Sequence, residues 1–203
     1  MASRDKVKVK KLQQTAGRNS KAVALLPPPN FSAVVDKLIY RSAFPEPCNF
    51  SFLESLQLRS VIIQSFGCLP SLDCSYLCSG RFPKENLQFL QSNNIKLFQL
   101  GIDGKDEETF AIPANAITNA LKILNDEKNY PLLIHCKAGM HRTGCLVGGL
   151  RKLHKWCLAP ILEEYKKFAG KRSREIDLKF LTEYDPSCLG TAAVRGSRCP
   201  CCP

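Results

Sequence analysis

Apolar residues along the chain fall into compact runs of strand length that alternate with segments of helical spacing. The compact runs are 38–44, 59–63, 96–102 and 131–136. The last of them, PLLIHC, is almost wholly apolar, as expected of a strand that is buried on both faces. Apolar residues recur every three or four positions in 49–58, 83–94, 112–128, from Thr143 onward, 160–169 and 173–184. This alternation predicts an α/β fold, with a mostly parallel central sheet flanked by helices.

A chain of 203 residues has the length of one domain with tails. We place the domain at residues 30–186, preceded by a basic disordered tail (1–29) and followed by a disordered Cys-rich tail (187–203). Within the domain, residues 64–82 form a long stretch of Ser, Cys, Gly and Pro where a short connection is usual. An additional surface loop is therefore predicted there.

The net charge of +11 is unevenly distributed, because residues 1–22 hold seven basic residues and one acidic residue. The rest of the chain is only moderately basic. This balance suits an anionic small molecule or a phosphoprotein as the partner, and it does not by itself indicate a nucleic-acid groove. No apolar run approaches the roughly 18 to 20 residues that cross a bilayer, so no membrane span is predicted.

The chain has 11 cysteines and no apolar secretory segment at its start, which predicts a reducing compartment, the cytoplasm. The Lys-rich start KVKVKK is interpreted as part of a disordered tail, with a nuclear address or a transit segment as the alternatives. Cys74 and Cys78 have no second pair nearby at zinc-ligand spacing, and we predict no metal.

The most informative stretch is HCKAGMHRTG, from His135 to Gly144. A strand ending at Cys136 and a helix starting near Thr143 leave a turn whose backbone N–H groups can all point inward. Gly139 lets this turn bend, and Arg142 adds a planar cation that grips two phosphate oxygens. These groups favour the thiolate form of Cys136. The loop is therefore predicted to hold a phosphate that the Cys136 thiolate attacks.

The other loop residues receive supporting roles. We expect Thr143 to donate its hydroxyl to the sulfur and His135 to orient the loop. His141 is either a substrate contact or a solvent-facing residue. The predicted substrate-binding residues of the loop are Lys137, Ala138, Gly139, Met140, His141 and Thr143. No cofactor is required, because amides and a guanidinium supply the positive charge that a metal ion would otherwise give.

Cys-x5-Arg-Thr after an apolar strand resembles the cysteine-dependent protein phosphatase superfamily. Residues 30–185 are similar to the plant and fungal atypical dual-specificity phosphatases. The similar blocks are NFS, IYRSAFP, NFSFL, LRSVI, ENLQFL, LFQLGI, LIHCK, HRTGCLVG and LRKLHKWCL. The resemblance implies removal of the β-phosphate from inositol pyrophosphates, with activity also on phosphotyrosine-type substrates. A protein tyrosine or dual-specificity phosphatase, and a phosphate-binding module without turnover, remain the alternatives.

The chain departs from this family in two places. Ala138 and Met140 stand where the family's loop usually has Arg and Lys, which removes two cations from its rim. Residues 63–75 resemble an insertion that follows directly after a strand.

The resemblance also suggests residues outside the loop. Asp106 stands where dual-specificity phosphatases carry the general acid, and Asp103 is the second candidate; Asp103 and Lys105 are also predicted substrate contacts. Arg172 and Arg174 match a basic pair of the family and are expected either to reach distal phosphates or to lie in a solvated turn. Arg41 is expected to form a structural ion pair.

Overall fold

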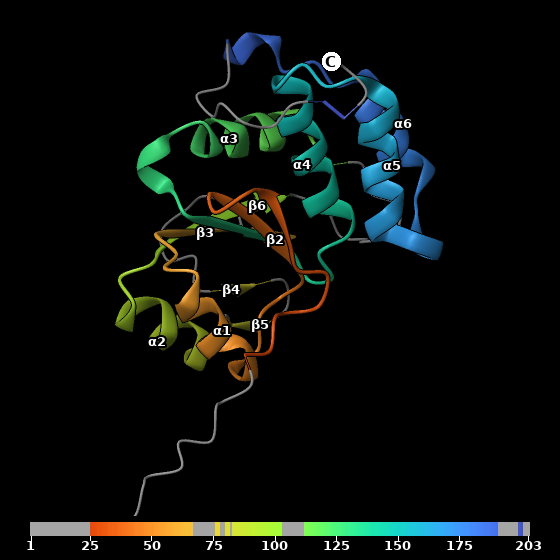
Figure 1. The fold of residues 1–203 in the computed structure, drawn as a ribbon. Coiled ribbons are helices and arrows are strands. Elements are labelled where there is room, and N and C mark those ends of the chain that lie inside the picture. The colour runs from red at the N-terminus through yellow and green to blue at the C-terminus, as the bar shows by residue number, and fades with distance from the viewer. Residues whose placement is uncertain are drawn as a thin grey trace, which may run out of the picture.

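The computed structural model of the chain describes residues 25–66, 76–77, 80–81, 83–102, 112–190 and 199–200 (Figure 1). Its centre is a five-stranded sheet in the order β1-β2-β7-β3-β6. The strands are β1 (Ser32–Val35), β2 (Ile39–Ser42), β3 (Ser60–Phe66), β6 (Lys96–Ile102) and β7 (Leu132–His135). Only β1 runs antiparallel to its neighbour; β2, β7, β3 and β6 are mutually parallel. The predicted α/β fold with a mostly parallel sheet is confirmed.

Helices cover both faces of this sheet (Figure 1). On one face lie α1 (Phe50–Ser55) and α2 (Lys84–Ser92). On the other lie α3 (Ala114–Leu124) and α4 (His141–Leu153), with α5 (Leu158–Ala169) and α6 (Glu175–Glu183) packed against α4. Short 3-10 turns are η1 (Pro47–Asn49), η2 (Glu127–Asn129), η3 (Gly170–Arg172) and η4 (Ser187–Leu189). Within these ranges, no helix has the length and apolar character that a bilayer crossing would need.

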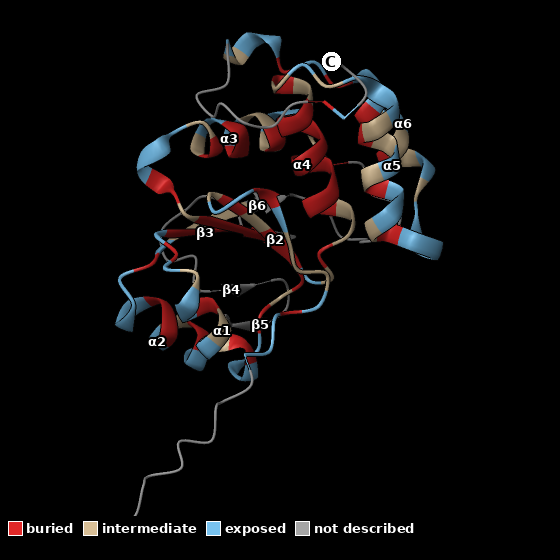
Figure 2. Cartoon of the chain, in the orientation of Figure 1, coloured by how far each residue is buried: buried red, intermediate tan, exposed pale blue. Residues whose placement is uncertain are grey.

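The core consists of two layers, one on each side of the sheet (Figure 2). Ile62, Leu132 and Ile134 face α3 and α4, whereas Ile63 and Leu133 face α1 and α2. All four residues of β7 are buried, as its uninterrupted apolar sequence predicts. The strand that leads into the HCKAGMHRTG stretch is therefore packed against core residues on both faces. It is hydrogen-bonded to β2 at one edge and to β3 at the other.

Three predicted boundaries differ from the structure. The domain begins before residue 30, because the Pro29 carbonyl accepts a hydrogen bond from the Ala43 amide (2.7 Å). It also continues past residue 186, since η4 lies there and Cys199 is buried with its sulfur 3.4 Å from the Cys157 amide nitrogen. The predicted insertion 63–75 starts inside β3, which continues to Phe66.

The predicted surface loop 64–82 also contains regular structure. Its described part includes a two-stranded antiparallel ladder of β4 (Tyr76–Leu77) and β5 (Gly80–Arg81). Strands of two residues fall below the length at which alternation of polar and apolar residues is recognisable.

A buried ionic cluster fixes α5 against α6. The Asp177 carboxylate accepts a hydrogen bond from the Tyr165 hydroxyl (2.6 Å) and two from the Arg174 guanidinium (2.8 and 2.7 Å). Asp177 is only 1% exposed, and it lies in the first turn of α6, where the helix dipole favours a negative charge. These bonds satisfy a carboxylate that would otherwise be costly to bury.

We expect Asp177→Ala to lower the free energy of unfolding by about 3 kcal/mol, because it removes two hydrogen bonds of the Arg174 guanidinium and the acceptor of the Tyr165 hydroxyl. Urea denaturation measures this loss. The matched control is Lys179→Ala, which breaks the exposed Lys179–Glu183 pair and should cost less than about 0.5 kcal/mol. Equal losses in the two variants would contradict a stabilising role for Asp177.

Candidate active site

The predicted nucleophile lies where the central strand ends. Cys136 directly follows β7, and α4 begins five residues later at His141. The Cys136 side chain is 3% exposed and Arg142, in the first turn of α4, is 6% exposed. Both residues are therefore buried, one at each end of the loop that joins the central strand to α4. This edge, beyond the carboxyl ends of the strands, is where parallel sheets place their ligands.

Three consecutive carbonyl groups of this loop are held from one side. The Lys137 carbonyl accepts a hydrogen bond from the Phe44 amide (3.2 Å), the Ala138 carbonyl from Asn30 Nδ2 (2.8 Å), and the Gly139 carbonyl from Arg41 Nη2 (2.9 Å). In a planar trans peptide, the N–H points opposite to the C=O. The amides of Ala138, Gly139 and Met140 are thereby directed away from residues 30–44. Successive amides that face one way form an anion-binding concavity.

Gly139 is required by the close approach of this loop to β2. Its φ is +67°, and a Cβ at this position would lie 2.5 Å from the Ala43 nitrogen and 2.5 Å from the Ser42 carbonyl carbon. Both atoms belong to the backbone, so they cannot move aside as the end of a side chain can. The predicted bend at Gly139 is confirmed, and the reason is both conformational and steric.

The Arg142 guanidinium is anchored on the opposite side of the loop. Its Nη1 donates to the carbonyl of Gln64 in β3 (2.6 Å). The Gln64 side chain is 1% exposed, and both of its amide atoms are buried with no hydrogen-bond partner in the described part of the chain. Gln64 therefore belongs to the site region, although the sequence analysis assigned it to a surface loop and an insertion.

The hydrogen bond predicted from Thr143 to the Cys136 sulfur is not formed. Thr143 is 0% exposed, and its hydroxyl oxygen is buried with no hydrogen-bond partner within the described residues. Its position in the first turn of α4 places it next to Arg142. The hydroxyl is an unused donor at the site.

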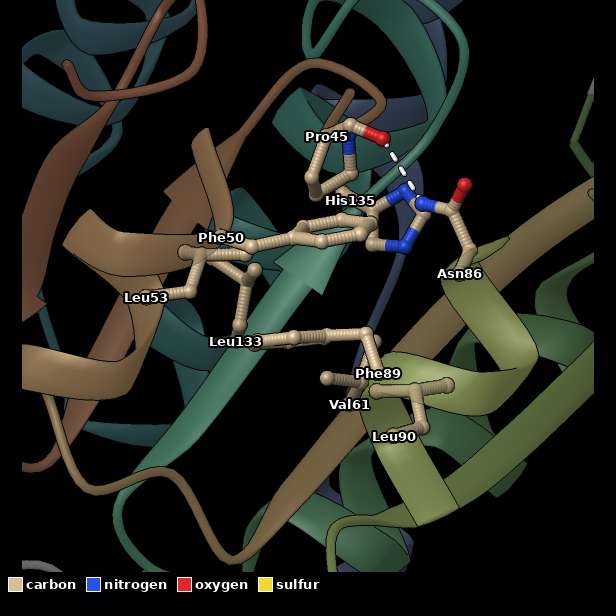
Figure 3. Close-up of a pocket in the computed structure, with 9 residues that line it drawn as sticks. All are labelled: Pro45, Phe50, Leu53, Val61, Asn86, Phe89, Leu90, Leu133 and His135. Atoms are coloured by element: carbon tan, nitrogen blue, oxygen red, sulfur yellow. Dashed lines mark hydrogen bonds between the residues drawn. The ribbon is translucent and has the colours of Figure 1, made fainter. Parts of the chain in front are cut away.

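His135 lies behind the loop, on the α1 and α2 side of the sheet (Figure 3). The pKa of His135 is lowered to about 3, mainly by burial and also by the nearby Arg142 charge, while a backbone hydrogen bond at Cys136 opposes the shift. The ring packs edge-on against Phe44, with centroids 5.4 Å apart. The cavity beside it has a volume of about 20 Å³, which is the size of one water molecule. His135 is thus neutral at pH 7, and its role in orienting the loop stays a prediction. The cavity beside it is too small for a substrate.

The remaining predicted contacts fall into two groups. His141 does not face solvent freely, because its Nε2 donates to the Arg172 carbonyl (2.6 Å) and so links α4 to η3. The Arg174 guanidinium is engaged by Asp177, which favours a structural role over the predicted contact with distal phosphates. Lys137 and Arg172 are exposed, and Ala138 and Met140 are partly exposed. Their substrate roles stay predictions.

The acidic loop lies outside the described residues. Asp103, Lys105 and Asp106 follow β6, and the identity of the general acid remains a prediction from the sequence. No group of three or more His, Cys, Asp or Glu side chains that could hold a metal ion occurs in the part of the chain that is described.

The free energy of unfolding should decrease as the pH is lowered, because His135 is buried in its neutral form. Its pKa is about 3 in the folded chain and near 6.5 when exposed, so between these values the unfolded chain binds a proton that the folded chain does not. From pH 7 to pH 5, His135 should contribute a loss of about 2 kcal/mol. Urea denaturation of the wild type and of His135→Asn at both pH values isolates this contribution. Identical pH dependence in both proteins would contradict it.

Gly139→Ala should destabilise the folded chain more than the backbone strain of its positive φ alone explains. Gly190 provides the matched control, since its φ is +73° and a Cβ there would have no heavy atom within 4 Å. We expect a loss of about 1 to 3 kcal/mol for Gly190→Ala, because φ +73° with ψ −148° is close to a region that only glycine readily adopts, and about 2 kcal/mol more for Gly139→Ala, from overpacking against the β2 backbone. Thermal or urea denaturation measures both. Equal losses would show that the close approach of the loop to β2 does not add to the destabilisation caused by Gly139→Ala.

Comparison with known proteins gives consistent matches. The model of the tyrosine phosphatase family matches residues 25–196. Inositol diphosphatase DSP3 of Arabidopsis thaliana is 52% identical over 161 residues, which cover 79% of this chain and 72% of that protein. Inositol diphosphatase SIW14 of Saccharomyces cerevisiae is 41% identical over 177 residues, which cover 87% of this chain and 58% of that protein.

A solved structure matches as well. The core catalytic domain of SIW14, described as a PP-IP phosphatase in complex with citrate, aligns with a TM-score of 0.68 and 42% identity, over 81% of this chain and 90% of that one. With Cys136 and Arg142 both buried at the loop that follows the central strand, these matches show that the chain belongs to the tyrosine phosphatase family.

Proposed function

We propose that this chain is a cysteine-dependent phosphatase that hydrolyses the β-phosphate of inositol pyrophosphates through a phosphocysteine intermediate. The observation that carries this proposal is the loop of residues 136–142. Hydrogen bonds from residues 30–44 hold the carbonyls of Lys137, Ala138 and Gly139 on one side of the loop. The amides that follow these carbonyls therefore point to the other side. A nucleophilic sulfur and a buried guanidinium lie in the same loop.

The reaction follows from these groups. The Cys136 sulfur attacks the terminal phosphorus, and the bond between this phosphorus and the bridging oxygen breaks. The loop amides and Arg142 stabilise the three equatorial oxygens, on which negative charge is greatest in the transition state. Water then attacks the phosphocysteine, releasing inorganic phosphate and restoring the Cys136 thiolate.

The leaving group favours a pyrophosphate substrate. A departing phosphate ester is a weaker base than an alkoxide, so it needs less protonation than the serine or threonine oxygen of a phosphoprotein. We assign the remaining proton transfer to Asp106, with Asp103 as the second candidate. The relatives at 52% and 41% identity are named inositol diphosphatases, which supports the same substrate class here. Lys137 and Arg172 are exposed, and their positive charge suits further phosphates of the substrate.

A protein tyrosine phosphatase is the second candidate function. A relative from Dictyostelium discoideum, named a probable tyrosine-protein phosphatase, is 38% identical over 160 residues. The rim also lacks two cations at Ala138 and Met140, which lowers its charge complementarity to a crowded polyphosphate. A phosphotyrosine peptide is therefore the substrate to compare directly.

Turnover of a diphosphoinositol polyphosphate beside a phosphotyrosine peptide tests the proposal, in metal-free buffer with chelator. We expect kcat/KM to be at least about tenfold higher for the inositol pyrophosphate, because binding of remote phosphates contributes to the transition state. A higher value for the peptide would favour the second candidate. A requirement for added metal would contradict the mechanism.

Cys136→Ser separates an enzyme from a binding module. We expect turnover to fall by more than about 10³-fold, because a serine hydroxyl is a much weaker nucleophile than a cysteine sulfur, while equilibrium binding of the substrate is retained. Cys48→Ser, at an exposed cysteine outside the loop, is the control and should leave turnover unchanged. Turnover that survives Cys136→Ser would remove this residue from the reaction.

A further inference from the structure

The most unusual buried side chain of the protein is Arg41. It lies in β2, is 1% exposed, and is the largest of the fully buried side chains that the structure describes. The expected ion pair is not formed in the described part of the chain. Instead, Nη2 donates to the Gly139 carbonyl (2.9 Å), and the guanidinium carbon lies 3.6 Å from the centroid of the Phe168 ring. Among the described residues, Nε and Nη1 have no hydrogen-bond partner.

This arrangement is costly for stability alone. Burial lowers the pKa of Arg41 to about 10, while the nearby charges of Glu164 and Cys136 raise it, so the guanidinium stays charged at neutral pH. Taking such a cation out of water is costly when no carboxylate of the described residues pairs with it, and an apolar side chain of similar size is often the more stable choice in a core. Packing in β2 therefore does not account for an arginine at this position.

The position of its one hydrogen bond suggests another role. The peptide between Gly139 and Met140 leads into the N-cap residue of α4, since Met140 precedes His141 and has φ −104° and ψ −84°, which is not a helical conformation. Neutral donors hold the two preceding carbonyls, those of Lys137 and Ala138. Gly139 receives a charged donor, and charge-assisted hydrogen bonds are roughly twice as strong as neutral ones.

We propose that Arg41 is a positioning residue for the phosphate-binding loop: by holding the Gly139 carbonyl, it keeps the Met140 amide directed toward the phosphoryl group in transfer. Its charge, packed below the loop, also adds to the positive potential at the Cys136 sulfur. Arg41 does not touch the substrate and acts through the loop backbone. The inference depends on phosphatase activity but not on the inositol pyrophosphate substrate, because an aryl phosphate tests it equally well.

Arg41→Met is the main variant, assayed with p-nitrophenyl phosphate and with orthovanadate as a transition-state mimic. Losing one oxyanion donor costs about 10²- to 10³-fold in kcat elsewhere. For a donor that is misdirected but not removed, we expect kcat to fall about 10- to 100-fold. KM should change less than about threefold, because the amide matters most where charge develops. The vanadate inhibition constant should rise with the loss in kcat.

Lys152→Met is the matched control. Lys152 is also a cation that donates to backbone carbonyls, those of Thr182 and Tyr184 (3.0 and 2.7 Å), but it lies at the other end of α4 from the loop. Its replacement should leave kcat and vanadate inhibition within about twofold of the wild type. A kcat for Arg41→Met within twofold of the wild type, or an equal loss in the control, would overturn the proposal.

Arg41→Ala provides a second readout, because it leaves a cavity that a guanidinium ion fits. Guanidinium chloride at about 50 mM is far below the concentrations that unfold proteins. It should raise the kcat of Arg41→Ala at least about fivefold. The same salt should not raise kcat of the wild type or of Lys152→Met. A folded Arg41→Ala that is not rescued overturns the proposal, as does failure of both Arg41 variants to fold, which would make Arg41 a structural residue.

Discussion

The site depends on the planarity of the peptide group. A carbonyl that is held on one side of the chain forces the following N–H to the other side, so an anion-binding loop can be organised entirely from behind. Here Phe44, Asn30 and Arg41 hold three successive carbonyls from the β1 and β2 side. The direction of the amides is set by these hydrogen bonds to the carbonyls, so no further group is needed on the side that receives phosphate. The donors are therefore in place before substrate arrives, which is the condition for strong electrostatic stabilisation of a transition state.

Sheet order explains why these holding groups converge. Because β7 lies between β2 and β3, the loop after it has a neighbouring strand end on each side. Residues from the β2 side hold the loop carbonyls, and the Gln64 carbonyl at the β3 side receives the Arg142 guanidinium. The close approach that this requires leaves no space for a Cβ at Gly139. The absence of a side chain at Gly139 thus allows the loop to lie against the backbone at the end of β2.

The sequence predicted the sheet class, the central strand and the Cys136–Arg142 pair because each depends on neighbours in the chain. An uninterrupted apolar run specifies a strand buried on both faces, and six residues fix the distance from the sulfur to the guanidinium. Arg41 and Asn30 were not recognised as parts of the site, since they contact the loop from about 100 residues away. Gln64 was missed because its Ser- and Cys-rich neighbourhood suggested a loop. Only strand order brings these residues to β7.

Three arginines show why charge alone does not specify a role. Arg174, predicted to bind phosphate, is engaged by the carboxylate of Asp177 and stabilises the contact between α5 and α6. Arg41, predicted to form an ion pair, makes none with the described residues and donates to the loop. Arg142 alone has the predicted position. A guanidinium has the same charge in all three settings, and the acceptor within its reach determines whether that charge is neutralised by the fold or remains to act on a bound anion. The sequence supplies the cations, and the tertiary packing supplies the acceptors that divide them between stability and catalysis.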